Sequence, residues 1–567
     1  MFHRLHTRDM FSQRSSAFAL ISLAFLAHAL SLSAAQGWRM VDDAYISFRY
    51  LDHFLAGHGL VFNPGERVEG YSNFLWIMVL ALPSTLGIPT PLAALVLGLV
   101  SGLVTLWLSL RLTERLTGAT WLGLCVAGIL ALDGSFARWS VEGLETLFFT
   151  ALITGAVLSE LDIAHHTRQS LWPSRPGLLL GLASLTRPEG LLFVGLLVLY
   201  RLINALGKTL KRHEELGPVG QTYEVRSRSL GDPLFWSSLA SFIVSALLLI
   251  LPHLLWRNSY YGEWVPNTAF LKVQPGFVST IRGIRYAVMF LVYRAPLVLL
   301  LLGLVAWRAF PSHARVSSKP PAQDMAQSPL HLLLFFSAGI VAYLTLTGGD
   351  WMGWGRFFMP LAPALSLLWS EKCVRLYQQT PAGLGYPRHP APLALIIAAA
   401  LLSHLTSSWL EERPRLLRAH EEHRERLAVI EWLREHASPS SRLLTEEIGE
   451  IPYETKLYTL DVYGLIDKHI AKNGIYDPDS APGHQKTELQ YSLAQQPDFL
   501  VMADFHSTWA RNVDPSYSQV RYPLLRNYIP VPVALPTGRL EIYRRQAHVS
   551  PLPTGKDSAD APSAAPD

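Results

Sequence analysis

The stretch VDDAYISFRYLDHFLAGHGLVFNPGERVEGYSN, residues 41–73, holds polar side chains that a membrane-spanning segment would not tolerate. It follows the first long apolar run of the chain and begins with two adjacent acids, Asp42 and Asp43. An unpaired carboxylate in hydrocarbon is costly, and Arg49 and Glu69 add further charges. We therefore predict a loop at the membrane surface. The alternative is an ordinary solvated loop whose acids flank the end of a helix.

The composition of the whole chain indicates a membrane protein. Half of the 567 residues are hydrophobic and only 16% are charged, which is too apolar for an ordinary soluble protein. A spanning helix needs about 20 consecutive apolar residues. Such runs recur near residues 17–35, 91–111, 119–133, 144–160, 175–187, 190–206, 233–256, 286–307, 330–347, 357–371 and 391–409. The pattern predicts an α-helical polytopic membrane protein.

Net charge and cysteine content exclude two other classes of protein. The formal charge of +4 is small and the basic residues lie in loops, so we expect no nucleic-acid partner. Cys125 and Cys373 fall within or at the end of apolar runs, which argues against a disulfide framework or a cysteine metal site. The basic, then apolar N-terminus lacks a convincing cleavage site and is interpreted as a retained first span.

Basic loops predict the membrane topology. The segment Phe74–Ile88 is only about 15 residues long and contains Pro83, so we interpret it as re-entrant or interfacial. With that assignment about eleven transmembrane helices remain, and the N-terminus is cytoplasmic. All basic segments then lie on one side: the N-terminus, Arg111–Arg115, Arg168–Arg175, Arg201–Arg228, Arg308–Lys319 and Lys372–Arg388. The unusual polar loops gather on the opposite, outer side.

Two of these outer loops carry paired charges near helix ends. Glu142 and Glu145 are three residues apart and share one helix face, which is also a favourable placement of acids at a helix N-terminus. Arg187 and Glu189 lie at a Pro–Gly break between two short helices. They are candidates for substrate binding, and the alternative is that they pair with each other.

Two further outer loops are suited to an anion or a sugar. Asn267 and Lys272 follow an interfacial tryptophan, and a lone lysine beside polar residues suits an anion. Asp350, Trp351 and Arg356 lie among four glycines and two tryptophans, as expected of a flexible aromatic platform for sugars or headgroups. The alternative for both loops is an ordinary polar connection at the membrane surface.

The C-terminal part differs in character from the rest. Residues 411–546 are charged, contain short apolar runs and predict an α/β extracytoplasmic domain, whereas residues 1–410 form the transmembrane part. Within the C-terminal part, Asp461, Asp467 and His469 form either a substrate-binding edge or a turn-rich surface loop. The Pro/Ala/Ser/Asp-rich tail, residues 547–567, is expected to be disordered.

The ordered set of these motifs resembles the GT-C membrane glycosyltransferases. The likeness is carried by DDAYISFRY from residue 42, GHGLVFNPGERVEGYSN from 57, EGLET from 142, TRPEG from 186 and PNT from 266. It continues through GDW from residue 349, GR from 355 and GLID from 464. The resemblance is greatest to the mycobacterial terminal β-(1→2)-arabinofuranosyltransferase group, and it covers residues 15 to 475.

This resemblance implies an inverting transferase that uses a polyprenyl-phosphate-linked sugar, arabinofuranose-like, on the outer face of a bacterial inner (plasma) membrane. The acceptor would be an envelope glycan, lipid or protein, and membrane lipids surround the chain. We expect Asp42 to act as general base and Asp43 as its orienting or metal-binding partner. The expected substrate-binding residues are Arg49, Glu69, Tyr71, Asn73, Glu142, Glu145, Arg187, Glu189, Asn267, Lys272, Asp350, Trp351 and Arg356.

Several alternatives stay open at this point. Adjacent acids suit a divalent cation such as Mg²⁺ or Mn²⁺, but two carboxylates do not complete a metal site, so no cofactor is assigned. A mannose, other hexose or aminoarabinose transferase is a rival within enzymes. A transporter or flippase of lipid-linked sugars is a rival from another class, although transporters usually contain internal repeats, and none is found here.

Overall fold

A computed structural model describes most of the chain. The described residues are 2–165, 173–215, 229–272, 276–293, 330–350, 352–353, 355–378, 415–477, 480, 483–503, 523–533 and 535–546. Two expected apolar runs, near 286–307 and 391–409, lie partly or wholly outside these ranges, as do Trp351 and the predicted disordered tail.

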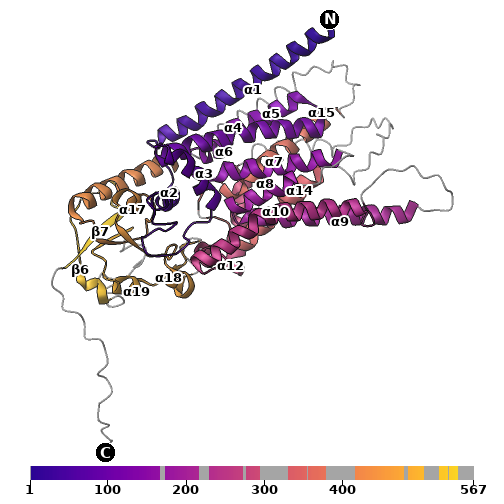
Figure 1. Ribbon diagram of the computed structural model, residues 1–567. Coiled ribbons are helices and arrows are strands. Elements are labelled where there is room, and N and C mark those ends of the chain that lie inside the picture. Colours follow the sequence, from indigo (N-terminus) through magenta and orange to yellow (C-terminus); the bar gives the residue numbers. More distant parts are fainter. Residues whose placement is uncertain are drawn as a thin grey trace, which may run out of the picture.

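The first two thirds of the chain form a bundle of roughly parallel helices (Figure 1). Its elements are α1 (Phe2–Ala35), α2 (Asp42–Leu55), α3 (Phe74–Thr85), α4 (Thr90–Thr117), α5 (Thr120–Leu132), α6 (Gly134–Trp139), α7 (Thr146–His165), α8 (Arg175–Thr186), α9 (Glu189–Glu215), α10 (Pro233–Tyr261), α11 (Asn267–Lys272), α12 (Phe277–Tyr293), α14 (Leu330–Thr347), the 3₁₀ helix η2 (Arg356–Leu361) and α15 (Ala362–Gln378).

Six helices in the described part of the chain are long and apolar enough to cross a membrane: α1, α4, α7, α9, α10 and α14. The polytopic helical prediction is confirmed, but the number of eleven spans is not. Several apolar runs form helices that are too short, such as α8 with 12 residues and α5 with 13. A helix of 12 residues is about 18 Å long, against about 30 Å of hydrocarbon.

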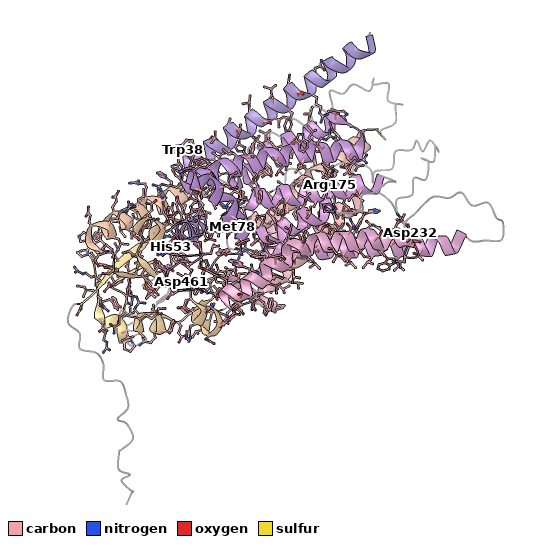
Figure 2. The ribbon with its side chains drawn as sticks, in the orientation of Figure 1. Trp38, His53, Met78, Arg175, Asp232 and Asp461 are labelled. Carbon is pink, nitrogen blue, oxygen red and sulfur yellow. The ribbon has the colours of Figure 1, made fainter. Side chains whose placement is uncertain are left out.

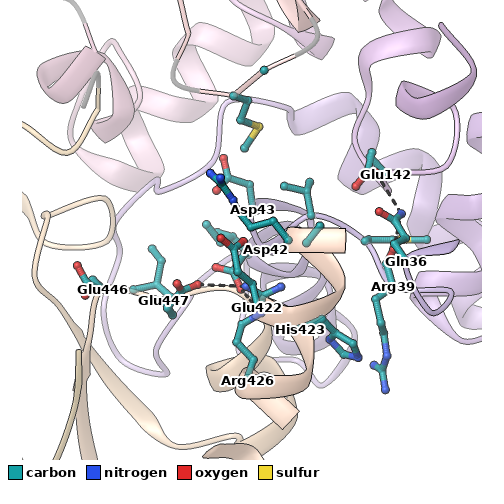
Figure 3. A pocket seen from close by; sticks show the side chains of 18 of the residues that line it. Gln36, Arg39, Asp42, Asp43, Glu142, Glu422, His423, Arg426, Glu446 and Glu447 are labelled. Carbon is teal, nitrogen blue, oxygen red and sulfur yellow. Dashed lines mark hydrogen bonds and ion pairs between the residues drawn. The ribbon is translucent and has the colours of Figure 1, made fainter. Parts of the chain in front are cut away.

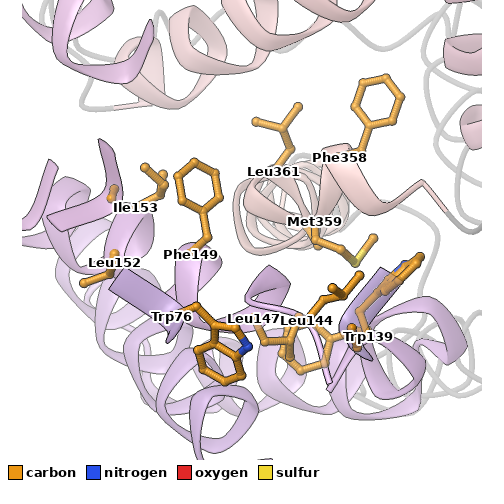
Figure 4. Close-up of a cluster of buried hydrophobic side chains, with 14 of the residues drawn as sticks. Trp76, Trp139, Leu144, Leu147, Phe149, Leu152, Ile153, Phe358, Met359 and Leu361 are labelled. Carbon is orange, nitrogen blue, oxygen red and sulfur yellow. The ribbon is translucent and has the colours of Figure 1, made fainter. Parts of the chain in front are cut away.

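The bundle core near one end is built from large aromatic side chains. Trp76 of α3, Trp139 of α6 and Phe149 of α7 are buried, together with Phe358 and Met359 of η2 (Figure 4). The Trp76 indole Nε1 donates to the Gly143 carbonyl at 3.0 Å, so its polar atom is satisfied as well. This packing fixes α3, the Gly143 turn and η2 relative to one another beneath the polar loops.

An ion pair supports the predicted positions of the basic segments. Arg14 of α1 and Glu114 of α4 lie 2.9 Å apart, which places the start of α1 and the end of α4 at the same end of the bundle. The 28-residue α4 therefore begins at the opposite end, where α3 also begins. Because α3 starts and finishes towards that one end, its arrangement agrees with a segment that does not cross.

Residues 415–546 form a separate layer against this end of the bundle (Figure 1). A helix over 415–436 precedes a five-stranded sheet of order β2-β1-β5-β7-β6, in which β1 is parallel to β2 and β5, whereas β7 is antiparallel to β5 and β6. The strands are β1 (Arg442–Thr445), β2 (Tyr458–Asp461), β5 (Phe499–Ala503), β6 (Tyr528–Pro530) and β7 (Leu540–Arg545), with the small pair β3 (Ile475–Tyr476) and β4 (Lys486–Thr487). The accompanying helices are α17 (Glu450–Thr455), α18 (Lys468–Asn473), α19 (Leu489–Ala494) and η4 (Pro523–Asn527). The predicted α/β domain is confirmed.

The stretch 41–73 is not simply a surface loop. Its first part is the helix α2, and the residues from Ala44 to Leu51 of that helix are buried on every side. The bundle packs on one face of α2 and the C-terminal domain on the other. Figure 2 shows His53 and Asp461 near the junction of these two parts and Asp232 towards the far end of the bundle. Sequence reasoning failed here because the covering domain is 400 residues away along the chain.

The placement of α3 makes the topology testable. In a background with Cys125 and Cys373 replaced by serine, single cysteines at Ser72 and Pro89 should both be labelled by an impermeant reagent added to intact cells, because both ends of α3 lie on one side. A cysteine at Thr117, at the far end of α4, serves as the control and should react only after the cells are opened. Labelling at Ser72 without labelling at Pro89 would contradict the arrangement.

Candidate functional site

The C-terminal domain is held on the bundle by buried polar side chains of the 41–73 stretch. The Arg49 guanidinium donates to the carbonyls of Phe62 at 2.8 Å, Pro452 at 2.5 Å and Leu457 at 2.7 Å. Asn63 donates to the Thr459 carbonyl at 2.8 Å and accepts from the Thr459 N–H at 3.1 Å, so it pairs with the edge strand β2. Arg49 was expected to meet the substrate, but its donors are occupied by carbonyl groups at this interface.

Asn267, another expected substrate residue, also holds the interface, and Glu69 supports Asn267 from within the bundle. Asn267 donates from Nδ2 to the carbonyls of Gly464 at 2.8 Å and Leu465 at 3.0 Å, which ties α11 to the C-terminal domain. Glu69 forms a buried ion pair with Arg257 of α10 at 2.7 Å, and its backbone carbonyl accepts from the Asn267 N–H. Burial raises the pKa of Glu69 to about 7 although Arg257 opposes the shift. The GLID motif, residues 464–467, therefore helps to hold the C-terminal domain on the bundle.

The two carboxylates at the start of α2 have different surroundings. Asp42 accepts from the backbone N–H of Gly449 at 2.9 Å and of Glu450 at 2.8 Å, which makes it a cap on the N-terminus of α17. Gly449 is required for this approach, since a Cβ there would lie 2.0 Å from the Asp42 carbonyl oxygen. Asp43 forms no hydrogen bond or ion pair with any described residue.

A buried charge cluster surrounds Asp42. The Arg426 guanidinium lies 3.8 Å from Asp42, 3.5 Å from Glu447 and 3.0 Å from Glu450. Burial raises the pKa of Asp42 to about 7, Glu447 raises it further and Arg426 opposes the shift. Burial would also raise the pKa of Glu450, but hydrogen bonds from His423 and Arg426 hold it below its usual value. Arg426 therefore balances three acids at the domain interface.

A second cluster lies deeper, where four separate sequence motifs meet. The Arg187 guanidinium bonds to Glu145 at 2.5 Å and to Glu189 at 3.2 Å, and Asn73 donates to the other Glu145 oxygen at 2.9 Å. Arg356 donates from Nε to Asp350 at 2.9 Å. The predicted convergence of these loops is found, and so is the alternative that Arg187 and Glu189 pair with each other.

A turn formed by Gly348 and Gly349 directs the following residue, Asp350, towards this cluster. Gly348 and Gly349 have φ values of +90° and +76°, which L side chains rarely adopt. A Cβ at Gly349 would also lie 2.7 Å from the Tyr286 ring. The turn ends α14 and returns the chain to η2, whose first residue is Arg356.

Two hollows meet at Asp43. The outer cavity, of about 440 Å³, lies between the bundle and the C-terminal domain and is lined by Asp42 and Asp43 together with Glu142, Glu447 and Arg426 (Figure 3). The inner cleft, of about 60 Å³, is lined by Asp43, Ser47, Tyr71, Asn73, Glu145, Arg187, Thr268 and Arg356. Asp43, Ile46 and Leu465 line both hollows, so an unpaired carboxylate stands at their junction.

The remaining expected residues have structural partners or fall outside the description. Glu142 pairs with Arg138 and accepts from Gln36 Nε2 at 3.1 Å at the wall of the outer cavity. The hydroxyl of Tyr71 lies 3.1 Å from that of Tyr261. The Lys272 side chain is outside the described residues, although its backbone ends α11.

Of the residues that the C-terminal domain contributes to the cavity, sequence reasoning named only Asp461, in its candidate substrate-binding edge. Arg415, Arg418, Glu422, His423 and Arg426 come from the helix over 415–436, and further lining residues are Glu446, Glu447, Asp461, Tyr463, His484 and Arg539. The alternating charges of this helix are also typical of a solvated surface helix. Its one available signal was the density of arginines on one face.

The described residues contain no group of three or more His, Cys, Asp or Glu side chains that could hold a metal ion. Both oxygens of Asp42 accept backbone N–H groups, which leaves Asp43 as the one carboxylate of the pair that faces the hollows without such bonds. The Asp42–Asp43 pair therefore does not fit a Mg²⁺ or Mn²⁺ site, and no chemical step is assigned to a cation.

Comparison with solved structures identifies the architecture. ArnT from Cupriavidus metallidurans bound to undecaprenyl phosphate superposes with a TM-score of 0.55 at 13% identity, over 94% of this chain and 99% of that one. The oligosaccharyltransferase AglB from Archaeoglobus fulgidus, in complex with an inhibitory peptide and a dolichol-phosphate, gives 0.50 at 12% identity over 95% and 75%. The chain has the GT-C fold.

Sequence comparisons agree with this architecture. A terminal β-(1→2)-arabinofuranosyltransferase of Mycobacterium tuberculosis is 27% identical over 354 residues, 58% of this chain and 51% of that protein. The chain thus spans about half the length of this curated relative. Residues 415–549 match a family model described as a domain of unknown function, DUF8728. The resemblance to GT-C glycosyltransferases predicted from the motifs is confirmed.

The raised pKa of Asp42 predicts how stability depends on pH. The folded pKa of about 7 lies above the usual aspartate value of 3.8, so the folded state binds the proton more tightly and stability falls as pH rises between about 4 and 7. Asp42→Asn should flatten the dependence of the unfolding free energy by up to about 1.4 kcal/mol per pH unit. Burial also raises the pKa of Glu69 and of Asp461, to about 7 and about 6, so a residual slope is expected.

The measurement is the melting temperature of the purified protein in detergent from pH 4 to 8. Glu435→Gln, at an exposed acid on the helix over 415–436, is the matched control and should retain the wild-type slope. Identical slopes for wild type and Asp42→Asn would show that Asp42 does not titrate in this range.

Proposed function

We propose that the chain is a membrane glycosyltransferase that moves a sugar from a polyprenyl-phosphate donor to an acceptor hydroxyl. The observation that carries the proposal is the position of Asp43, an unpaired carboxylate at the junction of an inner cleft containing two arginines and a larger outer cavity. A transferase needs this arrangement, because a base must lie between the donor phosphate and the acceptor. The GT-C fold and the arabinofuranosyltransferase likeness support it.

Asp43 is assigned as the general base, in place of Asp42. Both Asp42 oxygens accept backbone N–H groups and face Arg426, so Asp42 serves to hold the first turn of α2 against α17. Asp43, the next residue on that turn, is left facing both hollows. A base must have its lone pairs available within hydrogen-bond reach of the acceptor hydroxyl.

The inner cleft is assigned to the donor phosphate. Arg187 is held through Nε, NH1 and NH2 by Glu145 and Glu189, and it acts as a rigid wall. Arg356 uses Nε for Asp350, so its terminal nitrogens are the donors assigned to phosphate. Two guanidinium groups and three carboxylates leave this cluster one negative charge in excess. Lys272, which ends α11 four residues after Thr268 of the cleft wall, supplies the compensating cation in this proposal.

The chemical step is a single displacement. The acceptor oxygen forms a bond to the anomeric carbon as the bond from that carbon to the phosphate oxygen breaks, and the configuration inverts. The acceptor proton passes to Asp43, and the electron pair leaves with the polyprenyl phosphate, whose charge Arg356 and Lys272 stabilise. The Arg356 guanidinium is held by Asp350 before the reaction, so it needs little reorganisation when that charge develops.

The likeness to an arabinofuranosyltransferase supports an assignment of the sugar and of the site of action. We assign an arabinofuranose-like sugar, an envelope glycan, lipid or protein as acceptor, and an outer-face active site in a bacterial inner membrane. Mass spectrometry of envelope glycans from cells with and without the protein tests the assignment. The expected result is the loss of one terminal pentose, and the loss of a hexose or an aminoarabinose would identify one of the rival donors.

Substitution at α2 tests the base. Asp43→Asn should lower the rate of sugar transfer about 10²–10⁴-fold, as for other positioned general bases, with unchanged folding and membrane insertion. Asp42→Asn should lower the rate of sugar transfer less, because Asp42 holds α2 in position and does not take the proton. The control is Asp52→Asn, at an acid later in α2 that pairs with Lys456. Loss in Asp42→Asn with full activity in Asp43→Asn would reverse the two roles. Full activity in both would move the base to Asp350 or Glu142.

The phosphate assignment has its own variants. Arg356→Ala and Lys272→Ala should each weaken the use of donor by about 1.5–3 kcal/mol, which corresponds to roughly a 10- to 150-fold loss in kcat/KM for the donor. Lys456→Ala removes a surface cation outside both hollows and should leave donor use unchanged. Wild-type dependence on donor concentration in both test variants would reject the assignment.

A further inference from the structure

The wall of the outer cavity that faces Asp43 belongs to the domain of unknown function. Arg415, Arg418, Glu422 and Arg426 of the helix over 415–436 all line the cavity. Their spacing of three and four residues places them on one face of that helix. In Figure 3, Glu422 and Arg426 extend from this helix towards Asp42, on the α2 side of the cavity.

Nearly all charges on this wall are already balanced within the protein. Arg426 pairs with Glu447 and Glu450, Arg539 pairs with Glu422 and Glu447, and Glu446 accepts from the Tyr463 hydroxyl at 2.7 Å. Among the described charged residues that line the cavity, Arg418 and Asp43 are the two that form no hydrogen bond or ion pair with another described residue. Asp43 belongs to the bundle and is partly buried, whereas Arg418 belongs to the C-terminal domain and is exposed.

The position of Arg418 favours an anionic ligand. Arg418 is exposed to the solvent of the cavity, with Arg415 one turn earlier and Glu422 one turn later on the same helix face. The guanidinium fork matches carboxylate and phosphate oxygens in geometry, and a cleft concentrates the field of its charges. A volume of about 440 Å³ is within the range of sites that enclose a ligand of several rings.

We propose that the acceptor carries a carboxylate or phosphate group near its reacting hydroxyl, and that Arg418 binds this group. Residues 415–549 then select the acceptor, whereas the bundle binds the donor. This inference rests on the proposed transferase function and adds the charge of the acceptor and the residue that recognises it.

The test uses the full chain in detergent or membranes, with a radiolabelled polyprenyl-phosphate sugar as donor and envelope extract from cells lacking the protein as acceptor. One portion of extract is left untreated, a second has its carboxylates amidated with a carbodiimide and an amine, and a third is treated with phosphatase. The variants are Arg418→Gln and Arg418→Lys. Arg424→Gln, at an exposed arginine of the same helix that does not line the cavity, is the matched control.

For the wild type we expect one of the two treatments to raise the apparent KM for acceptor about tenfold, and the treatment that does so identifies the anion as carboxylate or phosphate. Arg418→Gln should show the same increase with untreated extract, no further increase with the effective treatment, and an unchanged KM for donor. Arg418→Lys should recover part of the loss, and Arg424→Gln should behave as wild type.

Three outcomes overturn the inference: neither treatment changes the wild-type KM, Arg418→Gln has wild-type KM, or the effects of variant and treatment add independently. These outcomes are distinct from a failure of the proposed function. If the wild type transfers sugar to no component of the untreated extract, the transferase assignment itself is wrong.

Discussion

The site depends on the bonds between Asp42 and the first N–H groups of α17. A carboxylate at this depth must be satisfied, and two backbone N–H groups with Arg426 nearby satisfy it. The same bonds fix the rotation of α2 about its axis. That rotation decides which of the two neighbouring acids faces both hollows. The docking of the C-terminal domain therefore also sets the orientation of the reactive carboxylate. The Arg49 bonds to three carbonyls hold the same interface from the other side of α2.

The distribution of charge over the two hollows follows one rule. Nearly every ionised group at the interface has an internal partner, since breaking a buried pair leaves an uncompensated charge that costs several kcal/mol. Arg187 between Glu145 and Glu189 and Arg426 among three acids follow this rule. Among the described charged residues that line the hollows, Asp43 and the exposed Arg418 are the exceptions. In a protein that pairs its charges so consistently, an unpaired charge in a cavity is the most informative observation about the ligand.

The fold class and much of the inner cluster were predictable from the sequence. Long apolar runs predict the helices. The basic segments all lie on one side, which predicts that the loops with Glu145, Arg187, Asp350 and Arg356 share the opposite end of the bundle, as they do. Three features were not predictable. The number of spans could not be predicted because several apolar runs form helices too short to cross. The rotation of α2, which gives Asp42 and Asp43 different surroundings, is set by a domain far away in the sequence. The cavity face of the 415–436 helix has the alternating charges of a solvated helix, and only docking shows which arginines are enclosed.

The packing of α2 between bundle and C-terminal domain has a consequence for synthesis. Asp42 and its partner Gly449 are separated by 407 positions along the chain. The C-terminal domain is therefore not yet synthesised when α2 leaves the ribosome. At about 5–20 residues per second, that interval lasts roughly 20–80 s. During this time the residues of α2 that end up buried have no cover from the later domain. A nascent chain would therefore need either transient protection of α2 by the insertion machinery or a helix that forms only when the C-terminal domain has been synthesised.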